Sequence, residues 1–546
     1  MQKGEFLKFP YFRKAMKATY IDYSETHSFS STVLSYVSRD PKLRPFLFNF
    51  PSIPAFAERI ENKKDTCDRA LLQKILKAQY KSLKNTRIPD KVLSNIELLS
   101  LPETYTITTG HQLNIFTGPL YFIYKIVTAI NLARDLKAAY PDKNFVPVYW
   151  MASEDHDFAE INHVSIHGKS IAWHQEQKGA TGKIPTTSIQ SALREYQKVL
   201  GLSENSKKLA LIMEEAYLEH DHLSEATRYL VNALFAEFGL VILDADHPEL
   251  KKLFSPIIAE DIIYKNSFRI ISETGKQLTQ EGFSTQATPR EINFFYMTEG
   301  LRERIVEHEG DYLVLNTDIR FTPSQLREEI ILHPERFSPN VIMRPLYQEW
   351  ILPNLAYVGG GAEMVYWMQL KANFDYYDVS YPLLVLRNSA LLTRENFNSK
   401  LGRLQLNVRD LFSDTSALQK EWVLRHTHHE LSLSDEKNEF RALFEKLKLR
   451  AYKVDPTLAP STEAVKTRFE KALDNLEKKF IKAEKRNHED ALSQIEALRN
   501  KYFPGGALQE RTENLGLFYV KHGEQLIVEL IKHFKPLDFK FTIIEP

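Results

Sequence analysis

The sequence predicts an α/β protein with a Rossmann-type core, in which helices cover both faces of a parallel β-sheet. The first observation is a set of near-continuous apolar runs with the composition of buried parallel strands. These runs span residues 105–109, 145–151, 239–246 and 383–387. The second observation is a helical pattern from Pro119 to about Ala139, between the first two runs, with proline at a position suited to a first turn. Buried strands that alternate with helices are typical of such a sheet.

The composition is that of an ordinary soluble globular protein. The 546 residues include 71 basic and 71 acidic side chains, so no overall basic charge favours nucleic acid or an anionic membrane. A single cysteine excludes an intramolecular disulfide and a zinc site of several thiolates, and it is typical of the reducing cytoplasm. The N-terminal residues show no secretory signal, and no apolar stretch is long enough to span a membrane. We therefore expect a cytoplasmic protein without nucleic-acid or membrane partners.

The N-terminal part of the chain, residues 1–100, is expected to be mostly helical. Residues 65–83 place Cys67 and several apolar side chains at helical spacing. The sequence neighbours of Cys67 are acidic, whereas a reactive cysteine requires a basic or histidine-bearing environment. We interpret Cys67 as a packed helix residue and not as a nucleophile.

The core region, residues 101–388, contains two stretches that are longer than one crossover helix requires. We predict insertions at about 158–235 and 267–336, attached at the carboxyl edge of the sheet, where crevices and lids form. The second insertion contains short strand-like segments at 293–297 and 311–315.

After about residue 389 the sequence changes to long charged helices. Residues 461–502 predict a helix of about 60 Å whose apolar positions approximate a coiled-coil seam, interrupted near Asn487. We predict a coiled-coil arm over 389–505 that makes a homodimer; the alternative is a solvated helical hairpin. Residues 506–546 are expected to close the chain with a helix and an edge strand.

The first candidate site follows the first predicted strand. Thr109, Gly110, His111 and Gln112 stand at its carboxyl end, where ligands bind in open parallel sheets. Gly110 permits a tight turn, while the two side chains after it can donate hydrogen bonds. Gly118 precedes a helix whose free N–H groups favour an anion such as phosphate.

The second candidate site follows the strand at 145–151. Glu154, Asp155, His156 and Asp157 place three carboxylates and an imidazole in four residues. Such a group binds a cation, an amine or a ribose, or is simply solvated. The nearby histidines at 163 and 167 lie in a strand-like segment, so a helical zinc pair is not expected.

The third candidate site is the segment from Ser338 to Lys371. Its polar residues are Asn340, Arg344, Gln348, Glu349, Tyr357, Glu363 and Lys371, and Arg387 follows the last strand. Gly359, Gly360 and Gly361 form a run between a strand and a helix in a chain with only 20 glycines. The run indicates close backbone approach, either to a ligand or within the fold. Arginine can clamp a carboxylate through two parallel hydrogen bonds.

Several nucleotide-binding and hydrolase motifs are absent from the sequence. It contains no G-x-x-x-x-G-K-[ST], G-x-G-x-x-G, H-E-x-x-H or G-x-S-x-G. A P-loop NTPase and a dinucleotide oxidoreductase are therefore disfavoured.

Four blocks resemble the bacillithiol biosynthesis cysteine-adding enzymes, a family of cysteine ligases. They are GHQLNIFTGPLY (110–121), VPVYWMASEDHDFAEINHV (146–164), SPNVIMRPLYQEWILPNLAYVGGGAEMVYW (338–367) and LLVLRNS (383–389). The resemblance extends over the whole chain. It implies a core like those of class I synthetases and nucleotidyltransferases, with two connecting-peptide insertions and a dimeric coiled coil. The implied reaction is the last step of bacillithiol synthesis, in which L-cysteine is joined to the amine of glucosamine-malate with ATP, either alone or together with Mg²⁺.

The resemblance also implies roles for the candidate residues. Catalytic roles fall on His111, Gln112, Asp155 and His156, and nucleotide binding falls on Thr109, Gly110, Gly118, Gly359, Gly360 and Gly361. Substrate binding falls on Glu154, Asp157, Asn340, Arg344, Gln348, Glu349, Tyr357, Glu363, Lys371 and Arg387. The alternatives are a nucleotidyltransferase or ligase for another small acid and a non-catalytic nucleotide-binding coiled-coil scaffold. Transfer-RNA charging is disfavoured by the zero net charge.

Overall fold

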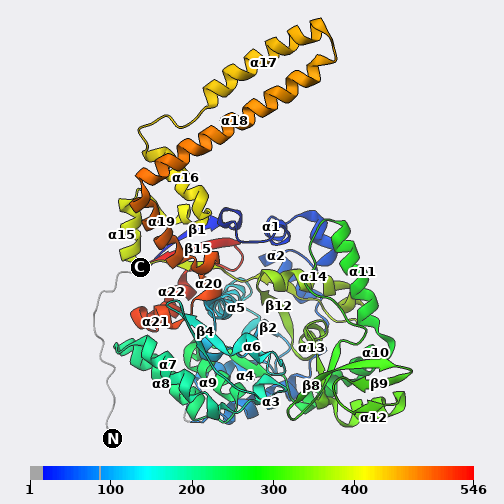
Figure 1. Ribbon diagram of the computed structural model, residues 1–546. Helices are drawn as coiled ribbons and strands as arrows, with labels where there is room; N and C mark the ends of the chain where they lie inside the picture. Colours follow the sequence, from blue (N-terminus) through cyan, green and yellow to red (C-terminus); the bar gives the residue numbers. More distant parts are fainter. Residues whose placement is uncertain (1–15, 85, 87, 177) are drawn as a thin grey trace. The chain divides into compact units, whose positions relative to one another are not determined.

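The computed structural model describes residues 16–546 except 85, 87 and 177, and the chain divides into two compact units (Figure 1). The first unit contains the chain up to Leu392 together with Ala507–Glu545. The second unit is Thr393–Gly506.

The first unit is built around a five-stranded parallel sheet with the order β13-β12-β2-β3-β6. Its strands are β2 (Thr104–His111), β3 (Asn144–Met151), β6 (Val241–Asp244), β12 (Asn354–Gly359) and β13 (Leu383–Leu386). Counted along the chain from the β6 edge, the order is 3-2-1-4-5, which is that of a Rossmann-type sheet. The predicted Rossmann-type core is confirmed. The strand order reverses between β2 and β12. In sheets of this type, a crevice forms at the carboxyl ends of the two strands that flank such a reversal.

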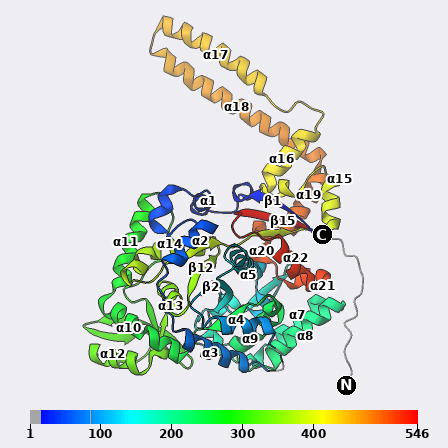
Figure 2. The same cartoon turned by 180° about the vertical axis from the view of Figure 1, so that it is seen from behind.

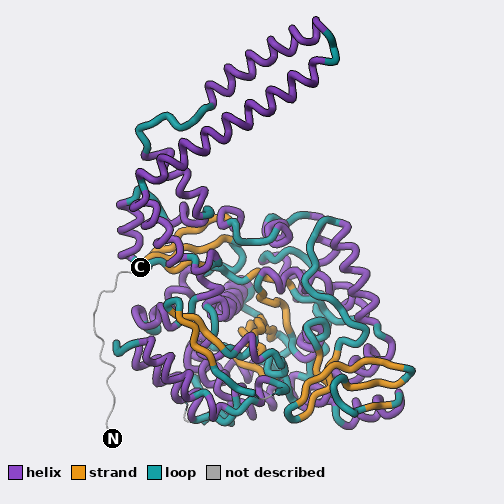
Figure 3. Tube along the Cα trace, in the orientation of Figure 1, coloured by secondary structure: helices purple, strands orange, loops and turns teal. Residues whose placement is uncertain are grey.

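Apolar helices cover this sheet. Helix α5 (Leu120–Ala139) contacts β2, β3 and β12, and α14 (Gly361–Tyr376) contacts β12 and β13 (Figures 1 and 3). A buried cluster joins α2 (Ile53–Glu61) and α5 to the sheet through side chains such as Phe56, Leu132, Ile107 and Val358. The predicted helix at 119–139 is confirmed. Its sequence is apolar around most of its circumference because it is buried on nearly all sides.

The N-terminal region contains helices and one unexpected strand. The helices are α1 (Ser31–Val37), α2, α3 (Arg69–Lys81) and α4 (Asp90–Leu98). The strand β1 (Lys17–Asp22) pairs antiparallel with β15 (Lys540–Glu545), which also pairs parallel with β14 (Ala390–Leu392) (Figure 2). The prediction that the last strand is an edge strand is therefore wrong. It has a hydrogen-bonded neighbour on each side, β1 from the N-terminal region and β14 from the end of the core region.

The prediction that Cys67 is a helix residue is wrong, because the observed helix α3 begins two residues after it. The Asp68 side chain caps α3 by accepting a hydrogen bond from Leu71 N at 2.9 Å. Cys67 Sγ donates to Ile351 O at 3.1 Å, and burial raises the pKa of the thiol to about 12. A thiol that stays protonated at neutral pH is not a nucleophile.

Two long stretches separate the core strands. Between β3 and β6 lie α6 (Phe158–Ile161), β4 (His163–Ile166), β5 (Lys169–Ala172), α7 (Gln190–Leu200), α8 (Glu204–Leu218) and α9 (Leu223–Phe235). Between β6 and β12 lie α10 (Pro248–Tyr264), α11 (Asn266–Gln280), α12 (Pro323–Leu332) and α13 (Arg344–Ile351). This stretch also contains an antiparallel sheet of β7 (Phe294–Thr298), β8 (Leu301–His308), β9 (Asp311–Val314), β10 (Arg320–Phe321) and β11 (Phe337–Pro339).

The second unit consists of helices and connecting loops (Figure 3). They are α15 (Glu395–Arg403), α16 (Thr415–His426), α17 (Ser434–Val454), α18 (Leu458–Asn487) and α19 (Glu489–Tyr502). The prediction of one continuous helix over 461–502 is wrong. The backbone leaves the helical conformation at His488, where α16 packs against both α18 and α19. Helices α17 and α18 pair along their length through ion pairs such as Arg441 with Glu470 and Lys448 with Glu463.

The closing segment returns to the first unit. It forms α20 (Gln509–Thr512), α21 (Gly516–His522), α22 (Gln525–His533) and β15. None of the helices in the described part of the chain combines the length and the apolar character needed to cross a bilayer.

Candidate active site

A cavity lies at the carboxyl ends of the parallel strands. Its volume is about 720 Å³, which is within the range of small-molecule sites. Gly110 and His111 end β2, Met151 ends β3, and Tyr357 lies near the end of β12; all four line the cavity. The cavity therefore lies at the reversal of strand order, where a Rossmann-type sheet binds ligands.

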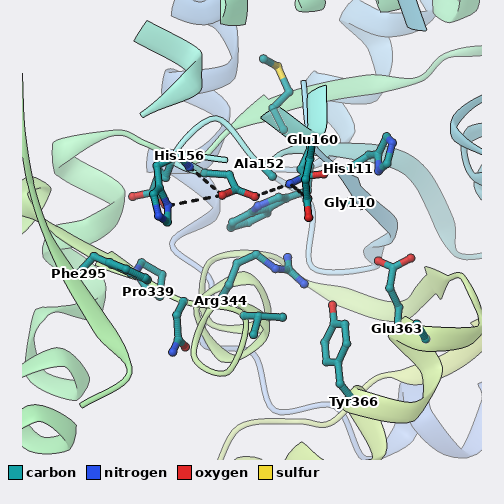
Figure 4. Close-up of a pocket in the computed structure, with 18 of the residues that line it drawn as sticks. Gly110, His111, Ala152, His156, Glu160, Phe295, Pro339, Arg344, Glu363 and Tyr366 are labelled. Carbon is teal, nitrogen blue, oxygen red and sulfur yellow. Dashed lines mark hydrogen bonds and ion pairs between the residues drawn. The ribbon is translucent and has the colours of Figure 1, made fainter. Parts of the chain in front are cut away.

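The residues that follow β3 give the cavity an acidic group of side chains. Gln112 Nε2 donates hydrogen bonds to Asp155 Oδ2 at 2.7 Å and to Glu160 Oε2 at 2.8 Å (Figure 4). Glu154 also lines the cavity, and its carboxylate is paired with the buried Lys251. A single amide side chain thus orients two carboxylates toward the same space.

The stretch between β6 and β12 gives the cavity a basic group of side chains. Arg302 on β8 donates from Nη1 to His156 Nδ1 at 2.6 Å, and its guanidinium lies 3.9 Å from the ring centre of Phe295. Arg344 at the start of α13 donates from Nη1 to Gln348 Oε1 at 2.9 Å. Its Nη2 is buried and has no hydrogen-bond partner among the described residues. Arg290 and Arg304 also line the cavity.

Lys125 is a buried residue of α5 whose side chain lines the cavity. Its Nζ donates to Gly110 O at 2.9 Å and forms an ion pair with Glu363. Glu363 also accepts hydrogen bonds from Tyr357 Oη at 2.6 Å and Gly360 N at 2.8 Å. Burial raises the pKa of Glu363, but Lys125 and these donors outweigh it and hold the pKa below its usual range. Glu363 is therefore an ionised carboxylate with its lone pairs engaged.

His111 is a neutral imidazole. Its ring stacks on Phe122 with 5.1 Å between ring centres and meets the edge of Tyr121 at 5.3 Å. Burial, with the nearby charges of Lys125 and Arg387, lowers the pKa of His111 well below its usual range. Its Nε2 is buried and has no hydrogen-bond partner among the described residues. The side chain can therefore exchange a hydrogen bond with a ligand, but it carries no positive charge at neutral pH.

We expect His111 to make the fold sensitive to acid. Below about pH 6.5 the unfolded chain binds a proton at this histidine that the folded chain does not, so the free energy of unfolding falls as the pH falls. In His111→Gln this contribution is lost, and the pH profile becomes flatter by at most about 1.4 kcal/mol per pH unit, the limit for one proton. Urea denaturation at a series of pH values measures the difference. His163→Gln, which removes an exposed histidine, is the control, and parallel profiles for the wild type and His111→Gln would contradict the expectation.

The structure brings ten of the predicted site residues to the cavity and leaves the others outside its lining. The ten are Gly110, His111, Gln112, Glu154, Asp155, His156, Asn340, Arg344, Tyr357 and Glu363. Gln348 and Glu349 lie fully buried behind Arg344 and bond to each other at 2.9 Å. Lys371 lies about 12 Å further along α14 than Glu363, where it pairs with Asp375 at 2.5 Å.

Two other predicted residues have structural partners. Arg387 forms a buried ion pair with Glu510 at 2.7 Å. The Asp157 side chain caps α6 by accepting a hydrogen bond from Glu160 N at 3.3 Å. The sequence marked both as polar residues near strand ends, but only the fold shows which partner each one meets.

Two of the predicted nucleotide-binding glycines, Gly118 and Gly361, are packed closely against other residues of the fold. A Cβ atom on Gly118, which has a φ of +58°, would lie 2.7 Å from Asn114 Cβ. At the start of α5, where phosphate binding is expected, Leu120 N donates to Glu513 O at 2.9 Å. A Cβ atom on Gly361 would lie 3.1 Å from Val33.

The remaining predicted nucleotide-binding residues also make internal contacts. A Cβ atom on Gly359 would lie 3.1 Å from Glu363, and Gly360 N is occupied by the Glu363 carboxylate. Thr109 Oγ1 donates to Val358 O at 2.8 Å and so ties β2 to β12. Of the two interpretations of the glycine run, the structure supports close approach within the fold.

Sequence reasoning missed several residues that line the cavity. They are Tyr121, Lys125, Glu160, Arg290, Arg302, Arg304 and Tyr366. Lys125 carried a usable signal, because a lysine within an otherwise apolar helix must be buried with a partner. Glu160 lies in the acidic block after β3. The three arginines carried no local signal, because Arg302 and Arg304 reach the cavity from β8 and Arg290 reaches it from the segment before β7.

These features define a Rossmann-like protein with a small-molecule site at the reversal point of its parallel sheet and a separate helical unit. Residues 16–388 match the family described as "Bacillithiol biosynthesis BshC, N-terminal Rossmann-like domain", and residues 390–546 match "Bacillithiol biosynthesis BshC, C-terminal coiled-coil domain". The chain belongs to the BshC family of bacillithiol biosynthesis, and the resemblance seen in the sequence is confirmed.

Relatives with the name "Putative cysteine ligase BshC" match almost the whole chain. The protein of Flavobacterium johnsoniae is 42% identical, over 96% of this chain and 99% of its own length. That of Flavobacterium psychrophilum is 42% identical over the same shares, and that of Christiangramia forsetii is 40% identical over 97% of this chain and 99% of its own length.

Proposed function

We propose that this protein is a ligase that joins L-cysteine to the amine of glucosamine-malate, with ATP as the co-substrate that activates the cysteine carboxylate. The observation that carries the proposal is the meeting of two opposite charge groups in one cavity. The basic group is Arg290, Arg302, Arg304 and Arg344, and the acidic group is Glu154, Asp155 and Glu160. A malate unit carries two carboxylates, whereas cysteine and the sugar each carry an amine, so the substrates match both groups. The names of the relatives point to cysteine as the acid.

The residues present fit an anionic co-substrate. The buried Nη2 of Arg344 and the buried Nε2 of His111 both lack partners among the described residues. A buried polar group without a partner is costly, so a ligand atom that completes these hydrogen bonds is favoured. ATP, when bound, supplies the group that turns a carboxylate oxygen into a leaving group.

Magnesium would enter with the phosphates of the nucleotide. Mg²⁺ bound in this way needs only one or two protein carboxylates, because it keeps several water ligands. Among the described residues no group of three or more His, Cys, Asp or Glu side chains is arranged to hold a metal by itself.

The side chains of the cavity have separate tasks in this proposal. Arg344 and Arg302 bind carboxylate or phosphate oxygens, for which the planar guanidinium is suited. Asp155 binds the ammonium group of cysteine. His111 exchanges a neutral hydrogen bond with the oxygen on which charge develops, and a preorganised bond of this kind stabilises a transition state. Lys125 and Glu363 hold the Gly110 carbonyl and the start of α14 in place.

One assay tests the proposed reaction directly. Purified full-length protein is incubated with ATP, Mg²⁺, L-cysteine and glucosamine-malate, and mass spectrometry detects the amide while chromatography separates AMP from ADP. We expect an amide whose formation requires all of the substrates, and nucleotide turnover that depends on cysteine. Reactions with L-serine or other small acids in place of cysteine test for a different acid substrate. Absence of both the amide and cysteine-dependent turnover would contradict the proposal.

We also propose that the helical unit mediates a homodimer. Leu443, Leu447 and Leu449 on α17 are 51%, 39% and 65% exposed, as are Phe469 and Leu476 on α18 at 43% and 41%. Exposed apolar side chains of this number along a paired hairpin mark an interaction surface. The family description of this region as a coiled coil supports the same partner, a second copy of the chain.

Light scattering tests the homodimer. We expect a mass of twice 63.4 kDa for the wild type and a shift toward 63.4 kDa for the double variant Leu447→Glu, Leu449→Glu. Lys446→Ala, which replaces a charged residue on the same helix, is the control. A monomeric wild type, or a double variant that stays dimeric, would contradict the proposal that the helical unit mediates the homodimer.

A further inference from the structure

The proposed ligation, on which this inference rests, requires a base for the attacking amine. In its last step the nitrogen forms a bond to the activated acyl carbon of cysteine. The bond from that carbon to the leaving oxygen breaks, and the oxygen takes the bonding electrons. The nitrogen must also lose a proton, and a side chain that accepts it accelerates such a step by about 10²–10⁴-fold. The six acidic or imidazole side chains that line the cavity are the candidates: His111, Glu154, Asp155, His156, Glu160 and Glu363.

Two of the carboxylates are neutralised by buried lysines. Glu154 pairs with Lys251, whose side chain is only 1% exposed. Glu363 pairs with Lys125 and accepts two further hydrogen bonds, from Tyr357 Oη and Gly360 N. A proton on either carboxylate would break a buried ion pair, which is strongly unfavourable.

Neither histidine is suited to take up the proton. A guanidinium only donates hydrogen bonds, so the 2.6 Å contact from Arg302 Nη1 requires His156 Nδ1 to be the acceptor. The neutral ring then carries its hydrogen on Nε2 and has no second acceptor atom. His111 lies buried near Lys125 and Arg387, whose charges oppose its protonation. Each imidazole is therefore suited to hydrogen bonding and not to proton uptake.

Both carboxylate oxygens of Asp155 already accept hydrogen bonds from neighbouring residues. Its Oδ1 accepts hydrogen bonds from His156 N at 2.7 Å and Asp157 N at 3.3 Å, and its Oδ2 accepts from Gln112. Protonation would weaken the bonds that shape this turn.

Glu160 differs from the other five candidates. Only Gln112 hydrogen-bonds its carboxylate among the described residues, at Oε2, so Oε1 is available. The second N–H of the same amide is held by Asp155, and this contact fixes the orientation of the amide. Figure 4 shows the Glu160 carboxylate pointing into the cavity. The residue is also exposed, so a proton taken from a substrate can pass on to water.

We infer that Glu160 is the catalytic base that accepts the proton of the attacking amine, with Gln112 as the positioning residue that aims its carboxylate. The proton moves from the nitrogen to Oε1 as the C–N bond forms, and it then leaves to solvent. Glu160 has no part in the activation of cysteine. The two halves of the reaction therefore depend on different side chains.

Glu160→Gln tests this assignment, because it keeps the size of the side chain and removes the proton acceptor. Ligation to glucosamine-malate is compared with the trapping of activated cysteine by hydroxylamine, a nucleophile that is largely unprotonated at neutral pH and needs no base. We expect kcat for ligation to fall by about 100-fold or more, while cysteine hydroxamate forms within about threefold of the wild-type rate. Glu160→Asp retains a carboxylate on a shorter side chain. We expect its kcat for ligation to lie between those of the wild type and Glu160→Gln. Glu195→Gln, an exposed glutamate on α7, is the matched control.

The outcomes separate this inference from the proposed function. A wild-type protein that makes no amide refutes the ligase proposal itself. If the wild type ligates and Glu160→Gln ligates within about threefold of it, Glu160 is not the base. If Glu160→Gln loses ligation and hydroxamate formation together, the residue acts in cysteine binding or activation, and the inference is overturned.

Discussion

Replacement of Arg387 by methionine is expected to lower the free energy of unfolding by about 3–5 kcal/mol. The guanidinium is 5% exposed and pairs at 2.7 Å with Glu510, which is fully buried. Its other hydrogen bonds go to Asn388 O and Ser389 Oγ. Methionine fills the space but leaves the Glu510 carboxylate buried without its counter-charge. Because Glu510 also accepts from Ala390 N at 2.9 Å, the loss affects the junction of β14 with α20.

Urea denaturation followed by tryptophan fluorescence measures this effect. Four of the five tryptophans lie in the first unit, at 150, 173, 350 and 367, so the signal reports mainly on the unit that holds the pair. In the double variant Arg387→Met, Glu510→Met both charges are absent, and we expect much of the stability to return. A single variant as stable as the wild type, or a double variant that loses the sum of the two single effects, would contradict the assignment.

Replacement of Arg344 by methionine is expected to reduce kcat/KM for ligation by at least about 30-fold, which corresponds to about 2 kcal/mol. Arg344 lines the cavity, and its Nη2 has no partner among the described residues, so a ligand oxygen is the partner it lacks. Its removal leaves an anionic substrate group without its counter-charge in a buried setting. The free energy of unfolding is measured alongside, because the side chain also loses its hydrogen bond to Gln348 and its contacts with Trp150, Tyr357 and Tyr366.

Steady-state kinetics with each substrate varied in turn locates the effect. Arg344→Lys keeps the charge but loses the planar fork, so it is expected to recover only part of the activity. Arg320→Met, a change at a 59% exposed arginine on β10, is the control. Wild-type kinetics in Arg344→Met would show that this guanidinium does not bind substrate.

The core of the fold could be predicted because its signals are local. Residues 145–151 are apolar enough to be a strand buried on both faces, residues 105–109 are rich in β-forming residues, and α5 shows its helical period directly. The strand pairing was less accessible. Sequence alone placed β15 at an edge because its partners, β1 and β14, lie about 520 and 150 residues away along the chain.

The candidate site was only partly predictable for the same reason. His111, Gln112 and Asp155 were found because they directly follow buried strands, and the carboxyl ends of parallel strands meet at one edge. Lys371 and Arg387 share the chemistry of a substrate-binding residue, yet they meet Asp375 and Glu510. A residue type shows what a side chain can bind, but the geometry decides which partner it reaches.

The sequence by itself determined the Rossmann-type class, the helical arm and the family, because hydrophobic period and long motif blocks are properties of neighbouring residues. Only the tertiary structure decided the charge of the cavity. It brought Arg302 from the antiparallel sheet to His156, and it brought the Glu513 carbonyl to Leu120 N at the start of α5. It also left the exposed Glu160 at the cavity with a single hydrogen bond to its carboxylate, from Gln112 to Oε2. Contacts between distant segments depend on how the sheet is assembled, and no local pattern records them.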